Sequence, residues 1–316
     1  MDMHKARWPG WQAVRCLGSG KVGTVFEIQH HGAGTIESGA LKVIQIPQDP
    51  EHIRQQRRQG QDLESVKQRY LTRMEETAAA YSQMASLKGH PNVLACEEPM
   101  YEPLPDGISW ELFVKTELLR PVSAVFAGGA SSQQVLRMGV DVSTALALCQ
   151  ERGLIHQGVK PSNVFVTEQG SYKLGDFGAA KATGIPCGGD ESCMAPEIYW
   201  GMGYDGRADV YALGILLYTF LNGGCLPLTA PGDDAQRVSD ACVQRLSGQE
   251  LPLPAGGSPA LQQIVLRACA YEPAKRYGSV LELRAALLTL LGEDPAATQF
   301  SSAREMSGDC FWRENG

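Results

Sequence analysis

Hydrophobic and polar positions divide the chain into a strand-rich first part and a helix-rich second part. From Trp11 to about Gln45, β-prone residues alternate with glycines, and segments 23–28 and 40–46 show the pattern of hairpin strands. A second strand group is predicted over 93–116. Beyond about Pro121 the apolar residues take helical spacing, over 135–152, 208–221, 235–246, 259–269 and 279–291. Strands followed by helices predict an α+β fold, with a small β-rich lobe joined to a larger helical lobe.

One helix is predicted inside the strand-rich part, over residues 70–87. Its apolar side chains recur every three or four residues, at Tyr70, Met74, Ala78, Tyr81, Met84 and Leu87. The preceding stretch, 49–69, is polar and rich in Gln and Arg, and its pattern assigns it no role. The final segment, 293–316, is polar and irregular, so we expect a loose tail there.

Composition and charge narrow the class of protein. The chain has 316 residues, 43% of them hydrophobic and 20% charged, which is typical of a globular protein. A net charge of −7 gives no broad basic surface for nucleic acid. The strongest apolar run, 210–221, is shorter than the roughly 20 residues of a membrane span.

The cysteines and the N-terminus bear on the compartment. The nine cysteines are scattered and contain no C-x-x-C pair, so free thiols in a reducing compartment are expected. The first ten residues lack the apolar stretch of a secretory signal. We therefore expect a cytoplasmic protein without a membrane span.

A glycine-rich segment is the first candidate for nucleotide binding. Residues 18–25 fit G-x-G-x-x-G-x-V, with glycines at Gly18, Gly20 and Gly23. Such glycines let a hairpin backbone approach phosphate oxygens without interference from a Cβ atom. A glycine-rich turn without a ligand is the alternative. A Walker-type phosphate loop is disfavoured, because Lys21 is followed by Val22 instead of Ser or Thr, and the first glycine of that motif would fall on Arg15.

Further motifs follow in a fixed order along the chain. Lys42 lies on a predicted strand in Ala-Leu-Lys-Val-Ile, and 176–178 reads Asp-Phe-Gly. Segment 156–163 reads His-Gln-Gly-Val-Lys-Pro-Ser-Asn, and 195–197 reads Ala-Pro-Glu. Together with the glycine-rich segment, these motifs resemble the bacterial-type Ser/Thr protein kinase family over residues 11–292.

The resemblance implies a two-lobed protein-kinase fold. It places the N-lobe at about 11–115, the hinge at 116–121, and the C-lobe at 122–292. It further implies that Asp209 holds the backbone of the catalytic loop and that Arg276 pairs with Glu197.

The resemblance also implies a site for ATP and Mg²⁺. Lys42 would hold the α- and β-phosphates, while Asn163 and Asp176 would coordinate the metal. Thr116 would guard the back pocket of the hinge. The Glu117 carbonyl and the Leu119 amide would pair with the adenine edge. The purine would be sandwiched by Val25, Ala40 and Phe165, although core packing alone also explains these apolar positions.

Several departures from the family pattern fall at positions that carry catalytic roles in the family. Gly158 stands in place of the catalytic aspartate, and Gln157 replaces the arginine that reads a phosphorylated activation loop. The helix position of the glutamate that partners Lys42 falls on Ala80. Glu76 lies one turn earlier on the same face, so it is either the replacement partner or an exposed helix carboxylate.

A fourth departure concerns the activation segment. The Gly-Thr pair that usually precedes Ala-Pro-Glu reads Gly189-Asp190. An aspartate here would lie near Lys160 of the catalytic loop, so a negative charge lost at position 158 is either compensated by Asp190 or left uncompensated, with Asp190 solvated.

Three functions remain open at this stage. The first is a pseudokinase that binds ATP and Mg²⁺ and signals through nucleotide-dependent conformation and an unknown protein partner. The second is an active Ser/Thr kinase in which another carboxylate orients the substrate hydroxyl, since phosphoryl transfer depends largely on positioning. The third, a scaffold that binds no nucleotide, is disfavoured because Lys42, Asn163 and Asp176 are all present.

Overall fold

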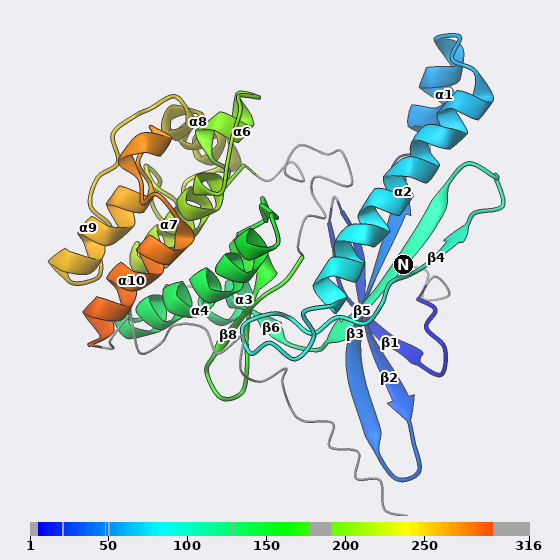
Figure 1. Ribbon diagram of the computed structural model, residues 1–316, viewed down its shortest axis with the longest axis horizontal. Coiled ribbons are helices and arrows are strands. Elements are labelled where there is room, and N and C mark those ends of the chain that lie inside the picture. The colour runs from blue at the N-terminus through cyan, green and yellow to red at the C-terminus, as the bar shows by residue number, and fades with distance from the viewer. Residues whose placement is uncertain are drawn as a thin grey trace, which may run out of the picture.

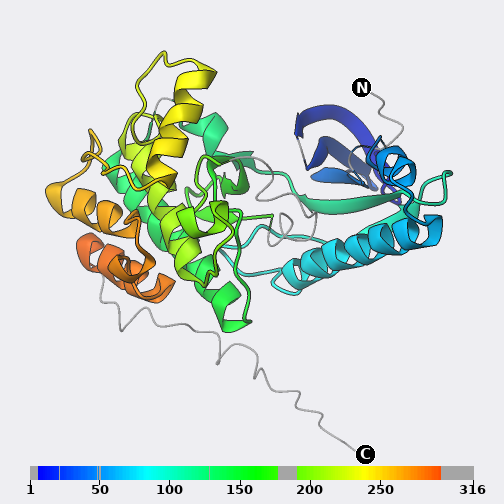
Figure 2. The same ribbon diagram turned by 90° about the horizontal axis from the view of Figure 1, so that it is seen from above.

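The computed structural model describes residues 6–292 except 21, 48, 50, 128 and 177–190. The described part has two lobes. A β-sheet with helices α1 and α2 lies at one end of the molecule, and the remaining helices gather at the other end (Figures 1 and 2). The predicted α+β, two-lobed class is confirmed.

The first lobe is built on a five-stranded antiparallel sheet of order β1-β2-β3-β5-β4. Its strands are β1 (Gln12–Gly20), β2 (Gly23–His31), β3 (Ile36–Ile46), β4 (Met100–Pro103) and β5 (Trp110–Glu117). Side chains alternate between the two faces of a strand, so Leu41 and Val43 of β3 join one buried cluster while Ile44 and Ile46 join the other. The strand group predicted over 93–116 forms regular strands only from Met100 onward, and isolated bridges precede it.

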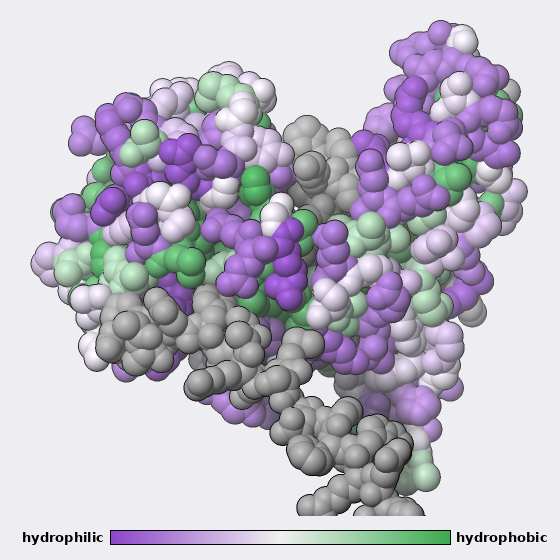
Figure 3. Space-filling model, viewed as in Figure 1, coloured by the Kyte–Doolittle hydropathy of each residue, from purple (hydrophilic) through white to green (hydrophobic). Residues whose placement is uncertain are grey.

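Two helices accompany this sheet, α1 (Glu51–Arg58) and α2 (Leu63–Ala85). Asp62 caps α2 by accepting a hydrogen bond from the Ser65 main-chain N–H. The helix predicted over 70–87 therefore begins earlier, and the unassigned stretch 49–69 forms α1 and the start of α2. The end of this helix pair projects beyond the sheet and carries mainly hydrophilic residues, which is why apolar periodicity did not reveal it (Figures 1 and 3).

The second lobe is helical. Its helices are α3 (Val122–Val125), α4 (Ser132–Glu151), α6 (Pro196–Tyr199), α7 (Arg207–Leu221), α8 (Ala235–Leu246), α9 (Pro259–Ala268) and α10 (Val280–Leu291). Helix α7 is buried along nearly its whole length and packs against α4, α9 and α10. All five helices predicted for this part are present, with bounds that differ by at most one turn.

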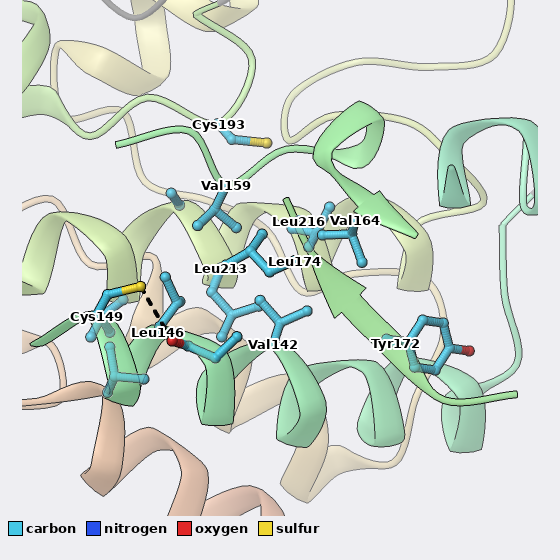
Figure 4. Close-up of a cluster of buried hydrophobic side chains, with 14 of the residues drawn as sticks. Val142, Leu146, Cys149, Val159, Val164, Tyr172, Leu174, Cys193, Leu213 and Leu216 are labelled. Carbon is cyan, nitrogen blue, oxygen red and sulfur yellow. Dashed lines mark hydrogen bonds between the residues drawn. The ribbon is translucent and has the colours of Figure 1, made fainter. Parts of the chain in front are cut away.

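A small second sheet lies where the lobes meet. It has three strands, in the order β6 (Arg120–Pro121), β7 (Val164–Val166), β8 (Tyr172–Leu174). Val164 and Leu174 pack on Leu146 of α4 and Leu213 of α7 in the core of the helical lobe (Figure 4). This packing fixes the ends of the segments that carry Asn163 and Asp176.

A buried ion pair joins the Ala-Pro-Glu turn to the segment that precedes α10. The Arg276 guanidinium donates to both carboxylate oxygens of Glu197, at 2.7 and 2.8 Å, as the resemblance implied. The Arg276 side chain is 0% exposed and that of Glu197 is 5% exposed. Breaking such a buried pair from one side strands the other charge, so the pair ties the Ala-Pro-Glu turn to the end of the lobe.

In the part of the chain that the structure describes, no helix combines the length and apolar character of a membrane span. The cysteines among these residues are all free thiols.

Candidate functional site

A cleft of about 900 Å³ lies between the five-stranded sheet and the small sheet β6–β8. Every residue predicted to bind the nucleotide or the metal lines it: Gly18, Gly20, Gly23, Val25, Ala40, Lys42, Glu117, Leu119, Phe165, Asn163 and Asp176. Two of them, Lys42 and Asp176, are 134 positions apart in the sequence. The fold thus assembles one site from the scattered motifs.

The glycine-rich hairpin forms one wall of the cleft. Gly18 lies opposite Val25, and Gly20 lies opposite Gly23. At Gly23, φ is +152° and a Cβ would lie 2.4 Å from the Val43 carbonyl oxygen, so only glycine fits. A Cβ at Gly18 or Gly20 would meet no atom within 4 Å. These two positions border open space, which is what a phosphate chain requires to approach the main chain.

Lys42 pairs with Asp176 across the cleft. Its Nζ atom lies 2.7 and 2.5 Å from the two carboxylate oxygens of Asp176. The Tyr81 hydroxyl donates a hydrogen bond of 2.8 Å to one of those oxygens, and Lys42 Nζ lies 5.9 Å from the centroid of the Tyr81 ring. The side chains of Lys42 and Asp176 are only 15% and 25% exposed, so solvent screens their attraction less than at a surface. We call these three residues the Lys42–Tyr81–Asp176 cluster.

The cluster fixes the protonation of its members. Burial alone would raise the pKa of Asp176, but the charge of Lys42 and the hydrogen bonds from Lys42 and Tyr81 outweigh it and hold that pKa below its ordinary 3.8. Burial, and then the adjacent Asp176 carboxylate, raise the pKa of Tyr81 well above its ordinary 10.0. At neutral pH, Asp176 is therefore an anion that accepts from two protein donors.

The structure decides between the two alternatives for Glu76. Glu76 is exposed, and Lys42 takes Asp176 as its partner instead. Tyr81, one residue after Ala80, is 1% exposed and faces Lys42. Successive helix residues point about 100° apart, so a difference of one position turns another side chain toward the lysine. Sequence reasoning missed this role because Tyr81 also fits the apolar stripe of the helix.

The catalytic loop is held as the resemblance implied. Asp209 of α7 is 0% exposed and accepts hydrogen bonds from the main-chain nitrogens of His156 at 2.8 Å and Gln157 at 2.9 Å. His156 Nδ1 accepts from the Gly158 N–H at 3.0 Å, so Nε2 carries the ring proton and donates to the Gly175 carbonyl at 3.1 Å. Helix α7, the loop and the residue before Asp176 form one connected unit.

The residue before Gly158, Gln157, has a left-handed φ of +57°, but Gly158 does not. A Cβ at Gly158 would lie 3.2 Å from His156 Cε1 and 3.5 Å from Asn163 Nδ2. The Gly158 carbonyl accepts a hydrogen bond of 2.8 Å from Asn163 Nδ2. Nothing in the backbone requires glycine here. The missing carboxylate is therefore a change of chemistry within an intact loop.

The two candidate metal ligands offer hard oxygen atoms. Since Asn163 donates through Nδ2, its Oδ1 atom is left to accept or coordinate, and the Ser162 hydroxyl lies 3.4 Å from it. Carboxylate and amide oxygens are ligands suited to Mg²⁺. No group of three or more His, Cys, Asp or Glu with metal-site geometry occurs among the described residues. This donor set fits a magnesium ion that takes its remaining ligands from phosphate and water.

The hinge has a side-chain contact that the sequence did not predict. The Glu117 carboxylate accepts hydrogen bonds from the Ala95 N–H at 2.6 Å and from Lys173 Nζ at 2.8 Å. The Thr116 hydroxyl donates to the Glu117 carbonyl at 3.1 Å. Glu117 thus ties the end of β5 to β8, three residues before Asp176. Sequence reasoning had assigned a role to its main chain alone.

Part of the predicted chemistry lies outside the described residues. This holds for Phe177 and Gly178 and for Gly189 and Asp190, so the proposed exchange between Asp190 and Lys160 stays a hypothesis. Lys160 itself is half-buried and is not among the residues that line the cleft.

Comparisons with curated proteins agree with this architecture. The Ser/Thr-protein kinase Pkn1 of Myxococcus xanthus is 29% identical over 304 residues, which cover 91% of this chain and 39% of that protein. The Ser/Thr-protein kinase PknB of Mycobacterium tuberculosis (strain ATCC 25618 / H37Rv) is 30% identical over 241 residues, covering 68% of this chain and 36% of that protein. The chain therefore spans well under half the length of these relatives.

A solved structure and a family model give the same result. The crystal structure of the Mycobacterium tuberculosis PknI kinase domain, in a double-mutant form, superposes with a TM-score of 0.59 at 26% identity, covering 91% of this chain and 98% of that domain. The protein kinase domain model matches residues 11–285. With its motifs assembled around one cleft, the chain belongs to the protein kinase family, of the bacterial Ser/Thr type.

Proposed function

We propose that the protein binds ATP with Mg²⁺ in the cleft and transfers phosphate far more slowly than an ordinary kinase. In this proposal it is a pseudokinase whose output is a nucleotide-dependent conformation recognised by a protein partner. Bound ATP would supply the transferable phosphoryl group, and Mg²⁺ would neutralise its charge.

The cleft residues support nucleotide binding. Lys42 would hold phosphate oxygens, and Asn163 and Asp176 would hold the metal. Lys42 now donates to both oxygens of Asp176, so nucleotide binding requires Lys42 to exchange this carboxylate for phosphate. The same exchange frees Asp176 for the metal. Binding is thereby coupled to a rearrangement of the Lys42–Tyr81–Asp176 cluster.

The observation that carries the proposal is Gly158. The surrounding loop keeps its hydrogen bonds to Asp209 and Asn163, yet the position that should accept the substrate proton has no side chain. Loss of a positioned general base costs roughly 10²–10⁴ in rate. Slow transfer follows without any loss of the binding site.

An active Ser/Thr kinase is the second candidate. It is supported by the presence of Lys42, Asn163 and Asp176 in one cleft and by the names of the relatives, which are Ser/Thr-protein kinases. In that case another carboxylate would orient the substrate hydroxyl. The two candidates share nucleotide binding and differ in turnover.

Thermal-shift titration tests the shared part. ATP with Mg²⁺ should raise the melting temperature of the wild-type protein, because a ligand that binds only the folded state stabilises it, by about 2.7 kcal/mol at 100 times Kd. Lys42→Met should abolish most of the shift, and so should replacing Mg²⁺ by EDTA. No shift in the wild type at millimolar ATP would sink both candidates and favour the scaffold.

A further inference from the structure

A buried arginine holds the end of the activation segment. Arg245 of α8 is 2% exposed. Its Nη2 atom donates to the main-chain carbonyls of Glu191 at 2.7 Å and Ser192 at 3.1 Å, and its Nη1 atom donates to the carbonyl of Met194 at 3.0 Å. One side chain thus binds three carbonyls within four consecutive residues.

The chemistry of these contacts couples the arginine to the segment. The hydrogen-bond acceptors of Arg245 among the described residues are all neutral: besides the three carbonyls, Nη1 donates to the Tyr211 hydroxyl at 2.8 Å, and the guanidinium lies 5.5 Å from the centroid of that ring. A guanidinium stays charged at any physiological pH, and a buried one must keep its hydrogen bonds. Moving residues 191–194 away would leave a buried cation without most of its acceptors, which is costly. The segment is therefore fixed from inside the protein.

A second contact links the same region to α8. The indole N–H of Trp200, which follows α6, donates to the Leu246 carbonyl at 2.7 Å, one residue after Arg245. Both flanks of the Ala-Pro-Glu turn are thus held by the end of one helix.

The usual phosphate-reading arginine is replaced here by Gln157. Its amide donates to the Tyr204 hydroxyl at 2.7 Å, so this side chain also makes a neutral contact. Between Asp-Phe-Gly and Ala-Pro-Glu the sequence contains two hydroxyl residues, Thr183 and Ser192. Ordering a loop by phosphorylation requires hydroxyl residues that can be phosphorylated and a cationic side chain that pairs with the phosphate. This chain has few such hydroxyls in the segment and lacks the usual arginine.

We propose that Arg245 is a positioning residue that holds residues 191–194 in one conformation without phosphorylation. This deepens the proposed function by assigning the regulation of the same site. In this proposal residues 191–194 are already ordered in the unmodified protein, and the nucleotide is left as the signal that changes.

Hydrogen exchange of the full chain tests the role of Arg245, and the measurement does not depend on nucleotide binding or turnover. In protein shown by mass to be unphosphorylated, the Met194 amide, which donates to the Glu191 carbonyl at 3.3 Å, should exchange about as slowly as amides at the end of α8. Arg245→Met should speed exchange at 191–194 by more than about tenfold and leave α9 and α10 unchanged. Arg245→Lys, which keeps the charge but has a single donor nitrogen, should give an intermediate increase.

The matched control is Arg237→Met. Arg237 lies on the same helix, is exposed, and donates to the Leu228 carbonyl at 3.4 Å. It should leave exchange at 191–194 unchanged. Equal effects of the Arg245→Met and Arg237→Met variants, or fast exchange of the Met194 amide in unphosphorylated wild type, would overturn the proposal. If neither Arg245 variant folds, the wild-type measurement still decides. The ATP thermal shift, run in parallel, reports on the proposed function separately.

Discussion

Tyr81 of α2 donates a hydrogen bond of 2.8 Å to Asp176, the carboxylate that also pairs with Lys42. In the family pattern this helix supplies a glutamate to the lysine. Here it supplies a neutral donor to the aspartate. The lysine therefore has the candidate metal ligand as its anionic partner. Under the proposed function, the nucleotide and its metal would compete with both contacts.

The variant Tyr81→Phe separates the contribution of this hydrogen bond to stability from its effect on nucleotide binding. The variant loses a hydrogen bond to a charged group, so its free energy of unfolding should fall by about 1.5–3 kcal/mol. The same loss leaves Asp176 with fewer protein donors, so the affinity for ATP with Mg²⁺ should rise a few-fold. Urea unfolding and calorimetric titration measure the two quantities. A fall in affinity would show that Tyr81 supports binding rather than competing with it.

Two glycines of the same hairpin should respond differently to alanine. Gly23→Ala places a Cβ 2.4 Å from the Val43 carbonyl oxygen at a φ of +152°, so it should destabilise the protein by about 2 kcal/mol or more. Gly20→Ala meets no atom within 4 Å, so its melting temperature should stay close to wild type while its affinity for ATP falls. Thermal melts with and without ATP compare them. Equal melting temperatures would contradict the close approach seen at Gly23.

Asp209 and His156 should give opposite pH dependences. Burial raises the pKa of Asp209 from 3.8 to about 6, despite hydrogen bonds from the His156 and Gln157 main chain, so its contribution to stability falls as pH rises from about 4 to 6. Burial lowers the pKa of His156 from 6.5 to about 4, so its contribution rises with pH over nearly the same range. The two should largely cancel in the wild type.

Asp209→Asn removes one side of this balance. The variant should have a lower free energy of unfolding than the wild type. As pH rises from about 4 to 6, this difference should shrink by on the order of 3 kcal/mol, because only the wild type loses the contribution of Asp209. Urea denaturation of both proteins at several pH values measures the difference, in which all other titrating groups cancel. A difference that stays constant over this range would mean that Asp209 does not titrate there.

The hinge assignment makes a prediction about inhibitors. Thr116 is small, lines the cleft and stands at the end of β5. Compounds that extend past the adenine should fit beside it, and Thr116→Met should exclude them by steric overlap. Their affinity should fall at least about tenfold more than that of ATP. Equal losses for inhibitor and ATP would argue against this hinge position.

The sequence predicted the fold and most of the cleft because local patterns encode both. The helices of the second lobe have apolar stripes, and the glycine-rich segment, Lys42 and Asp176 carry their chemistry in short motifs. Contacts between motifs were harder to predict. Whether Ala80 or Tyr81 faces Lys42 depends on the rotation of α2, which packing against the sheet determines.

Other misses have similar physical causes. Helix α1 contains a single apolar residue, Ile53, so its sequence looks like a polar insertion. The strands of the small sheet are only two or three residues long, too short for a periodic signal. The contact of Glu117 with Lys173 and the clamp of Arg245 on 191–194 join residues more than fifty positions apart. Such pairings require the folded chain.

Transfer of the γ-phosphate by wild type and Gly158→Asp tests the central claim most directly. The backbone at 158 accepts a side chain with shifts of a few tenths of an ångström, so both Gly158→Asp and its control Gly158→Ala should fold and bind ATP. Restoring the carboxylate should raise transfer to a generic protein substrate by roughly 10²–10⁴, and Gly158→Ala should not raise it. If the wild type already turns over at about 1 s⁻¹ or faster, Lys42→Met abolishes that rate, and Gly158→Asp adds nothing, the pseudokinase account is contradicted.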